Sequence, residues 1–236
     1  MELREAMRTS GAVRQFTDEA VPDEVLSRVL DDARFAPSGG NTQPWTVLVL
    51  RDQELRGKIR DLAVLGWREY IAQVRAGVRP FAPGTDGRWH GAIVDLGQAA
   101  ATPAPMSFVD ELDQAPVLLV LVARLMSLAV TDIELDRISV IGGASVYPFA
   151  QNLLLAARAE GLGGTLTTFV ARRDPQAAAL LGLPPGYALA GGLALGYPQR
   201  RATRLRRRPV EQFARVDTFD GAPFPGPAGA VDPGPA

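Results

Sequence analysis

A row of polar and flexible residues, APSGGNTQPW at positions 36–45, stands between a helical pattern and the apolar run TVLVL. Ser38, Asn41 and Gln43 carry side chains that can hydrogen-bond to the edge of a planar heterocycle or to a phosphate. Gly39 and Gly40 allow backbone N–H groups to approach a ligand closely. The row fits a loop that binds an organic cofactor and, equally well, an elaborate connection between a helix and a strand.

Several other kinds of catalytic chemistry are excluded by the composition. The chain has no cysteine and one histidine, His90, so disulfides, a Cys nucleophile and a cluster of metal-binding histidines are not available. We interpret His90 as a loop residue. GGASVY lacks the second glycine of a nucleophile elbow, and Lys58 in RGKIR does not belong to a phosphate-binding loop. Catalysis would therefore depend on an organic cofactor that supplies its own reactive atoms, and we expect no metal site.

The elements that would position these residues are helices and strands in mixed order. Spacing of apolar residues predicts helices at 21–36, 52–75 and 142–161 and strands at 46–50, 115–125 and 187–198. The strand at 115–125 is apolar on both faces, which is typical of the centre of a sheet. These patterns predict an α+β or α/β domain, and no linker interrupts residues 1–213, so one domain is favoured.

Charge and hydropathy give little support to nucleic-acid or membrane binding. The formal net charge is −1, and the apolar run at 115–123 is far shorter than the roughly 20 residues that cross a bilayer. The first ten residues lack the apolar core of a signal peptide. Six arginines between 200 and 208 would by themselves allow a nucleic-acid patch. We expect a soluble, cytoplasmic protein that binds neither nucleic acid nor membrane.

The order and spacing of several segments resemble the FMN-dependent nitroreductase family over about residues 3–213. The segments are VRQFTDEAVPDEVLSRVLDDA, APSGGNTQPW, APVLLVLVA, GGASVYPFAQNLLLAARAEGLGGTLTTF and LLGLPPGYALAGGLALGYP. The resemblance implies an α+β nitroreductase-like fold, with a central mixed β-sheet flanked by helices, in an intertwined homodimer. It also implies an FMN-binding domain at residues 1–216, followed by a Pro/Gly-rich C-terminal tail at 217–236.

The resemblance also implies which residues contact FMN at the dimer interface. One subunit supplies the loop at 36–45, the backbone at 166–168 faces the flavin near N5, and arginines hold the phosphate. The matching residues are Ser38, Gly39, Asn41 and Gln43, then Leu166, Thr167 and Thr168, and finally Arg14 with Arg206 and Arg208 of RLRRRP.

This sequence departs from the family pattern just before Arg14. Ser10, Gly11 and Ala12 occupy places where an arginine and a hydroxyl are common in the family. Losing one charge-assisted bond to the phosphate would cost about 1.5–3 kcal/mol. Ser10, the Gly11 backbone or Arg8 are candidates to compensate, and we include Ser10 among the cofactor-binding residues.

The implied activity is hydride transfer from NADPH or NADH, through flavin N5, to an electron-poor or unsaturated small acceptor such as a nitroaromatic or quinone. No side-chain catalyst is implied, and sharing of one cavity by donor and acceptor predicts ping-pong kinetics. The region 66–112 would select the substrate. Its aromatic or soft residues are Trp67, Tyr70, Phe81, Trp89, His90, Met106 and Phe108, and we interpret more than half of them as core or dimer contacts. The alternatives are a flavin-dependent dehydrogenase or dehalogenase of a specialised metabolite, and a non-catalytic flavin-binding or sequestering protein.

Overall fold

The computed structural model describes residues 1–201 and 205–227, and the rest of the predicted tail, 228–236, lies outside these ranges. Its strands are β1 (Trp45–Leu50), β2 (Val117–Arg124), β3 (Gly163–Thr167) and β4 (Tyr187–Gly196). They form one sheet in the order β1-β2-β4-β3, and each pairing is antiparallel. The α+β class is confirmed. The mixed sheet is not found among the described residues, because β4 separates β2 from β3 and these two same-direction strands never pair.

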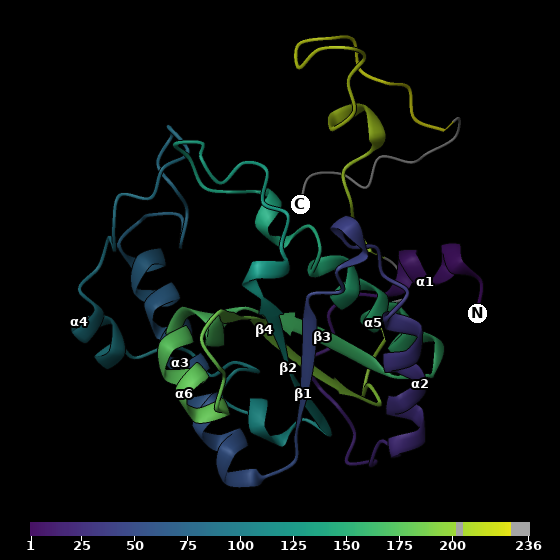
Figure 1. Cartoon of the computed structure of the whole chain (residues 1–236), viewed down its shortest axis with the longest axis vertical. Helices are drawn as coiled ribbons and strands as arrows, with labels where there is room; N and C mark the ends of the chain where they lie inside the picture. Colours follow the sequence, from purple (N-terminus) through teal and green to yellow (C-terminus); the bar gives the residue numbers. More distant parts are fainter. Residues whose placement is uncertain (202–204, 228–236) are drawn as a thin grey trace.

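Helices cover both faces of the sheet (Figure 1). They are α1 (Leu3–Thr9), α2 (Asp23–Ala33), α3 (Gln53–Arg75), α4 (Leu96–Ala101), α5 (Tyr147–Ala159) and α6 (Asp174–Leu181). Leu119 and Leu121 of β2 pack in one core with α2 and α5, whereas Leu118 and Val120 pack in a second core with α3 and α6. Side chains alternate across a strand, so the apolar sequence of β2 follows from its having a core on each face.

The ends of the helices follow local sequence signals. The Asp52 carboxylate accepts a hydrogen bond from the Leu55 N–H at 2.7 Å and so caps the start of α3. The predicted helix at 142–161 begins only at Tyr147, after a 3₁₀ turn at Ile141–Gly143. Pro148 is compatible with this start, because in the first turn of a helix the N–H that proline lacks would have no intrahelical partner.

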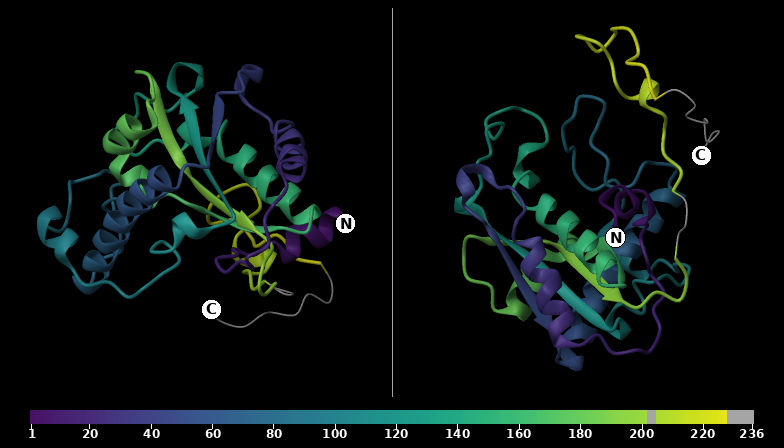
Figure 2. Two further views of the ribbon diagram at one scale, coloured as in Figure 1. Left: turned by 90° about the horizontal axis from the view of Figure 1, so that it is seen from below. Right: turned by 90° about the vertical axis from the view of Figure 1, so that its right-hand side faces the viewer.

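Residues 205–227 form an arm that extends away from the sheet and its helices (Figures 1 and 2). The arm folds back on itself through a bridge between Arg215 and Pro223 and a 3.0 Å hydrogen bond from the Phe224 N–H to the Ala214 carbonyl. Phe213 and Phe219 of the arm are exposed. The predicted boundary at residue 216 stays a prediction. None of the helices in the described ranges is long and apolar enough to cross a membrane.

Candidate cofactor site

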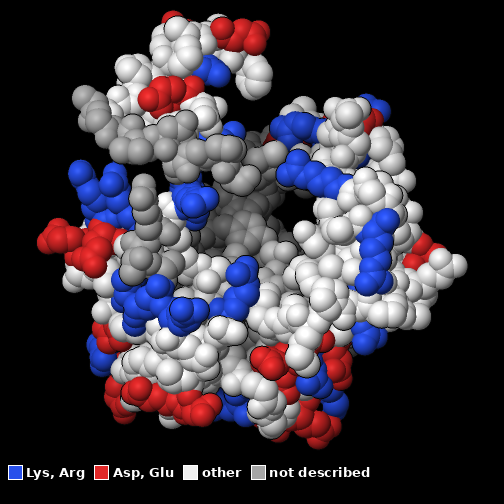
Figure 3. All heavy atoms as spheres, turned by 180° about the vertical axis from the view of Figure 1, so that it is seen from behind, with Lys and Arg blue, Asp and Glu red and all other residues white. Residues whose placement is uncertain are grey.

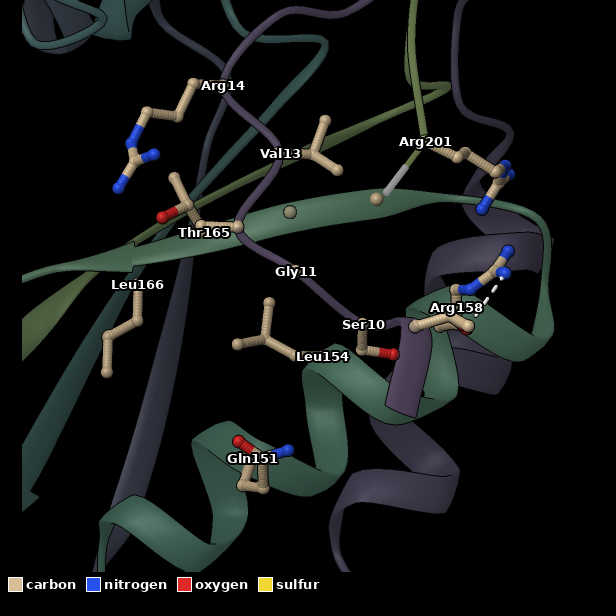
Figure 4. A pocket seen from close by; sticks show the side chains of 14 residues that line it. Ser10, Gly11, Val13, Arg14, Gln151, Leu154, Arg158, Thr165, Leu166 and Arg201 are labelled. Atoms are coloured by element: carbon tan, nitrogen blue, oxygen red, sulfur yellow. Dashed lines mark hydrogen bonds between the residues drawn. The ribbon is translucent and has the colours of Figure 1, made fainter. Parts of the chain in front are cut away.

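A cavity of about 230 Å³ lies between the end of α1, α5 and β3 (Figure 4). Residues 9–14 cross over β3, and the Val13 N–H donates to the Gly164 carbonyl at 2.9 Å. A Cβ atom on Gly163 would stand only 2.6 Å from a Val13 methyl carbon. The glycine in β3 is therefore what allows the N-terminal segment to lie against the strand and form one wall of the cavity.

Two arginines from distant parts of the chain meet at one side of this cavity. Arg158 comes from the last turn of α5, and Arg201 follows β4. Arg158 Nη2 donates to the Thr9 hydroxyl at 3.2 Å, and the Arg201 guanidinium donates to the Gly161 and Leu162 carbonyls. Burial and then the nearby charge of Arg158 lower the pKa of Arg201. The two positive charges therefore lie close to each other.

The arginine pair lacks an acidic partner within the described residues: neither Arg158 nor Arg201 lies within 4.0 Å of a carboxylate there. In addition, Arg158 Nε and Ser10 Oγ are buried and make no hydrogen bond to a described residue. Figure 4 shows the Ser10 hydroxyl and both guanidinium groups on the same side of the cavity. Buried polar groups are normally paired, so unpaired donors beside uncompensated positive charge favour an anionic ligand such as a phosphate.

The predicted residues divide between this cavity and its surroundings. Ser10, Arg14 and Leu166 line it, with the Arg14 guanidinium on the side away from Arg158 (Figure 4) and 5.3 Å from the centre of the Phe108 ring. Thr167 is buried in β3 opposite Gly192. Thr168 is exposed at the end of β3 and lines a second cavity.

Hydrogen bonds within the loop at 36–45, together with one to Ser145, hold its backbone in place. Ser38 Oγ accepts from the Gln43 N–H at 3.0 Å, Gln43 Nε2 lies 3.3 Å from Asn41 Oδ1, and the Gly39 N–H donates to Ser145 Oγ at 3.0 Å. Gly40, Asn41 and Gln43 all have positive φ angles. Backbone strain of this kind costs about 1–3 kcal/mol for a non-glycine residue and concentrates at ligand sites.

The loop and the arginine pair lie at opposite ends of α5. Ser145, which holds the loop, precedes the first residue of α5, and Arg158 lies in its last turn. At a helical rise of 1.5 Å per residue, Tyr147 at the start of α5 and Arg158 in its last turn lie about 17 Å apart. Ser38, Gly39, Asn41 and Gln43 do not line the cavity beside the arginine pair.

Arg206 and Arg208 are exposed on the C-terminal arm and do not line the cavity. Arg158 and Arg201 lie there instead, and the sequence interpretation did not select them. A basic residue in the last turn of a helix commonly interacts with the helix dipole, so ARAEG carries no signal for a ligand. Basic side chains also border a hollow on the back of the molecule, and acidic side chains gather along the lower edge of the molecule (Figure 3).

The second cavity, of about 320 Å³, lies beyond the end of β3. Its lining consists of Phe81, Trp89, Thr168, Phe169 and Arg172. Phe81 and Trp89 belong to the region predicted to select the substrate. Other members of that region have different partners: Trp67 Nε1 donates to the Pro105 carbonyl at 3.0 Å, and His90 Nε2 lies 3.0 Å from the Asp86 carboxylate.

Comparison with known proteins identifies the family. Residues 7–197 match the model of the nitroreductase family. Human iodotyrosine deiodinase 1 is 30% identical over 215 residues, which cover 90% of this chain and 67% of that protein. The fold is shared with a BluB-like flavoprotein from Clostridium difficile 630 (TM-score 0.65, 22% identity, 92% of this chain and 100% of that chain). It is also shared with an NADPH:FMN oxidoreductase from Vibrio harveyi (TM-score 0.62, 20% identity, 92% and 77%). This match covers most of the chain, including the segment before Arg14 and the strand that lines the cavity. The chain therefore belongs to the nitroreductase family of flavin oxidoreductases.

Proposed function

We propose that the protein is an FMN-dependent oxidoreductase that uses NADH or NADPH to reduce an electron-poor or unsaturated small organic compound. The observation that supports this most directly is the cavity beside β3, where Arg158 and Arg201 have no acidic partner among the described residues and Ser10 Oγ is unpaired. These groups fit the phosphate of FMN, because a phosphate accepts several charge-assisted hydrogen bonds at once. Arg158 and Arg201 line the same cavity as residues 10–12, where the sequence lacks the arginine common in the family.

The chain's own residues would bind and orient the cofactor. Arg158, Arg201 and Ser10 would hold the phosphate, and the strand residues up to Leu166 would lie along the rest of the molecule. FMN supplies the hydride-transferring atom when it is bound, so the chain needs no nucleophile. Leu166, Thr167 and Thr168 remain our candidates for the contact with the reactive part of the ring.

We propose a homodimer in which the loop at 36–45 of one subunit completes the site of the other. The distance between loop and arginine pair within one chain supports this arrangement, and so do the exposed aromatic side chains of the arm, Phe213 and Phe219. Light scattering at micromolar protein should give the mass of two chains. A single-chain mass in the presence of FMN would contradict the proposal.

The activity is tested by the absorption spectrum of the purified protein with added FMN under anaerobic conditions. We expect FMN to bind and its visible absorption to bleach on addition of NADH or NADPH. Recovery of the visible flavin absorption after addition of a nitroaromatic or quinone would show that the reduced flavin passes its electrons to that acceptor. Binding without bleaching by either donor would favour a sequestering protein, and failure to bind FMN would contradict the proposed function.

Reductive dehalogenation is a second candidate, and it is favoured by the 30% identity to a protein named iodotyrosine deiodinase over 90% of this chain. The same flavin site would serve both reactions. The two candidates are separated by offering the reduced protein a halogenated phenol and measuring halide release. Halide release without turnover of nitroaromatics or quinones would replace the first candidate by the second.

Replacing Arg158 with glutamine should weaken FMN binding without affecting riboflavin, which lacks the phosphate. The loss of one charge-assisted contact, about 1.5–3 kcal/mol, corresponds to about a tenfold to hundredfold higher Kd for FMN. Flavin fluorescence titration measures both ligands. Arg34→Gln, which removes an exposed arginine paired with Asp31 on α2, is the matched control. An equal loss for FMN and riboflavin, or a loss only in Arg206→Gln, would overturn this assignment.

A further inference from the structure

The second cavity follows the first along the same stretch of chain. Gly163 to Leu166 line the first cavity, and Thr168, Phe169 and Arg172 line the second. If FMN lies along β3, the second cavity is where the compound to be reduced would bind. The identity of this cavity as a substrate site rests on the proposed function, whereas the chemistry of its ligand can be inferred from its walls.

Arg172 is held in one position by a buried carboxylate. Its Nε and Nη2 atoms donate to the two oxygens of Glu69 at 2.8 and 2.7 Å, and Glu69 is 0% exposed. The paired carboxylate raises the pKa of Arg172, so the guanidinium stays charged. Arg172 Nη1 makes no hydrogen bond to another described residue, and the side chain is 31% exposed. The remaining N–H groups are available to a ligand in the cavity.

The charge around Arg172 is not balanced by Glu69 alone. Glu69 also lies 3.8 Å from Arg173 Nη2, so two guanidinium groups share one carboxylate. Arg173 Nε is buried and has no hydrogen-bond partner in the part of the chain that the structure describes. The lining of the cavity includes no Asp or Glu within the described ranges. The local excess of one positive charge favours an anionic ligand.

The other walls of the cavity are aromatic, and the backbone of Phe81 is held in place by a hydrogen bond. Phe81 has a φ angle of +53°, which is unusual for a bulky residue, and its N–H donates to the amide oxygen of Gln73 at 2.9 Å. Gln73 is 0% exposed and lies 3.4 Å from the Glu69 carboxylate. The Arg172 guanidinium carbon lies 5.6 Å from the centre of the Phe81 ring. One buried network therefore positions both the aromatic wall and the cation.

We infer that this cavity selects planar aromatic substrates that carry a carboxylate. The ring packs against Phe81, Trp89 and Phe169, and the carboxylate accepts hydrogen bonds from Arg172. Arg172 acts as a specificity residue: it binds the substrate and takes no part in the electron transfer.

Binding of 4-nitrobenzoate and 4-nitrobenzamide to the oxidised protein tests this inference. The two probes have similar shape and differ in charge. Titration calorimetry is carried out with saturating FMN and without an electron donor, and is repeated without FMN. We expect the wild-type protein to bind 4-nitrobenzoate at least about tenfold more tightly than 4-nitrobenzamide. This ratio corresponds to the binding free energy of one charge-assisted hydrogen bond.

The variant that tests the role of Arg172 is Glu69→Gln with Arg172→Gln. It replaces the ion pair by two amides that can still hydrogen-bond to each other. Arg173 keeps the local excess at one positive charge in this variant. A fall of the benzoate preference to about one, with binding of the amide unchanged, is therefore expected only from the loss of the Arg172 N–H groups themselves. Arg172→Lys, which keeps a point charge, should retain part of the preference. Equal binding of the two probes, binding of neither, or an unchanged preference in the double variant would overturn the inference. A benzoate preference in a protein whose flavin is not reduced would refute the proposed activity and leave this site standing.

Discussion

Replacing Arg172 with methionine should lower the free energy of unfolding by about 3 kcal/mol, because it leaves Glu69 as a buried charge without its main partner. Breaking a buried ion pair by removing one partner costs about 3–5 kcal/mol. We expect a cost at the lower end of this range, because Arg173 Nη2 lies 3.8 Å from the Glu69 carboxylate and partly compensates its charge. For a chain of this size the loss corresponds to a fall in Tm of about 6–12 °C, measurable by thermal and urea denaturation.

Two controls separate the buried charge from a general effect of losing an arginine. The double variant Glu69→Met with Arg172→Met removes both charges and should recover most of the stability, because apolar replacements of a buried pair are often tolerated. Arg34→Met breaks an ion pair whose side chains are 58% and 62% exposed, so it should cost less than about 1 kcal/mol. An Arg172→Met variant as stable as Arg34→Met would show that Glu69 does not need its partner.

Replacing Gly66 with alanine should destabilise the protein by about 2–3 kcal/mol. Gly66 lies in the middle of α3, and a Cβ atom there would stand 2.6 Å from the Phe169 carbonyl oxygen. The contact is with backbone, so the 3₁₀ turn Phe169–Arg173 must move away from α3, and overpacking of this kind costs about 1–3 kcal/mol. The same displacement would separate Arg172 from Glu69. We therefore expect a lower Tm together with weaker binding of 4-nitrobenzoate.

Gly57→Ala is the matched control, because Gly57 lies in the same helix and its Cβ would meet nothing closer than an Arg60 side-chain nitrogen at 3.9 Å. Alanine is favoured over glycine inside a helix by about 1 kcal/mol. The two substitutions are chemically identical and should change Tm in opposite directions. A Gly66→Ala variant at least as stable as the wild type would mean that α3 and the turn have room for a methyl group between them.

The elements whose surroundings are encoded locally were predictable from sequence. The apolar strand at 115–125 was placed correctly at the centre of the sheet, because a strand with two buried faces cannot alternate in polarity. The order of the strands was not predictable in this way. It depends on contacts between distant parts of the chain, which place β4 between β2 and β3. The described residues therefore form an antiparallel sheet where a mixed one was expected.

The site shows the same limit. The loop at 36–45 stands out in the sequence because Gly40, Asn41 and Gln43 must adopt unusual backbone angles, and such positions favour particular residue types. Arg158 and Arg201 carry no comparable signal. They are separated by more than forty residues and meet only because the C-terminal end of α5 packs beside the segment that follows β4.

The N-terminal segment that crosses β3 also joins the two ends of the domain. Thr17 donates its N–H to the Tyr197 carbonyl at 2.8 Å, Phe16 bridges to Pro198, and Arg201 reaches the carbonyls at the end of α5. The contacts of Phe16 and Thr17 join residues about 180 positions apart and so carry a large loop-closure entropy. During synthesis Ser10, Arg158 and Arg201 cannot come together until β4 and the segment after it have left the ribosome. A cofactor that binds only the completed cavity would then stabilise the finished chain by mass action, and a chain ending before residue 197 would gain nothing from its presence.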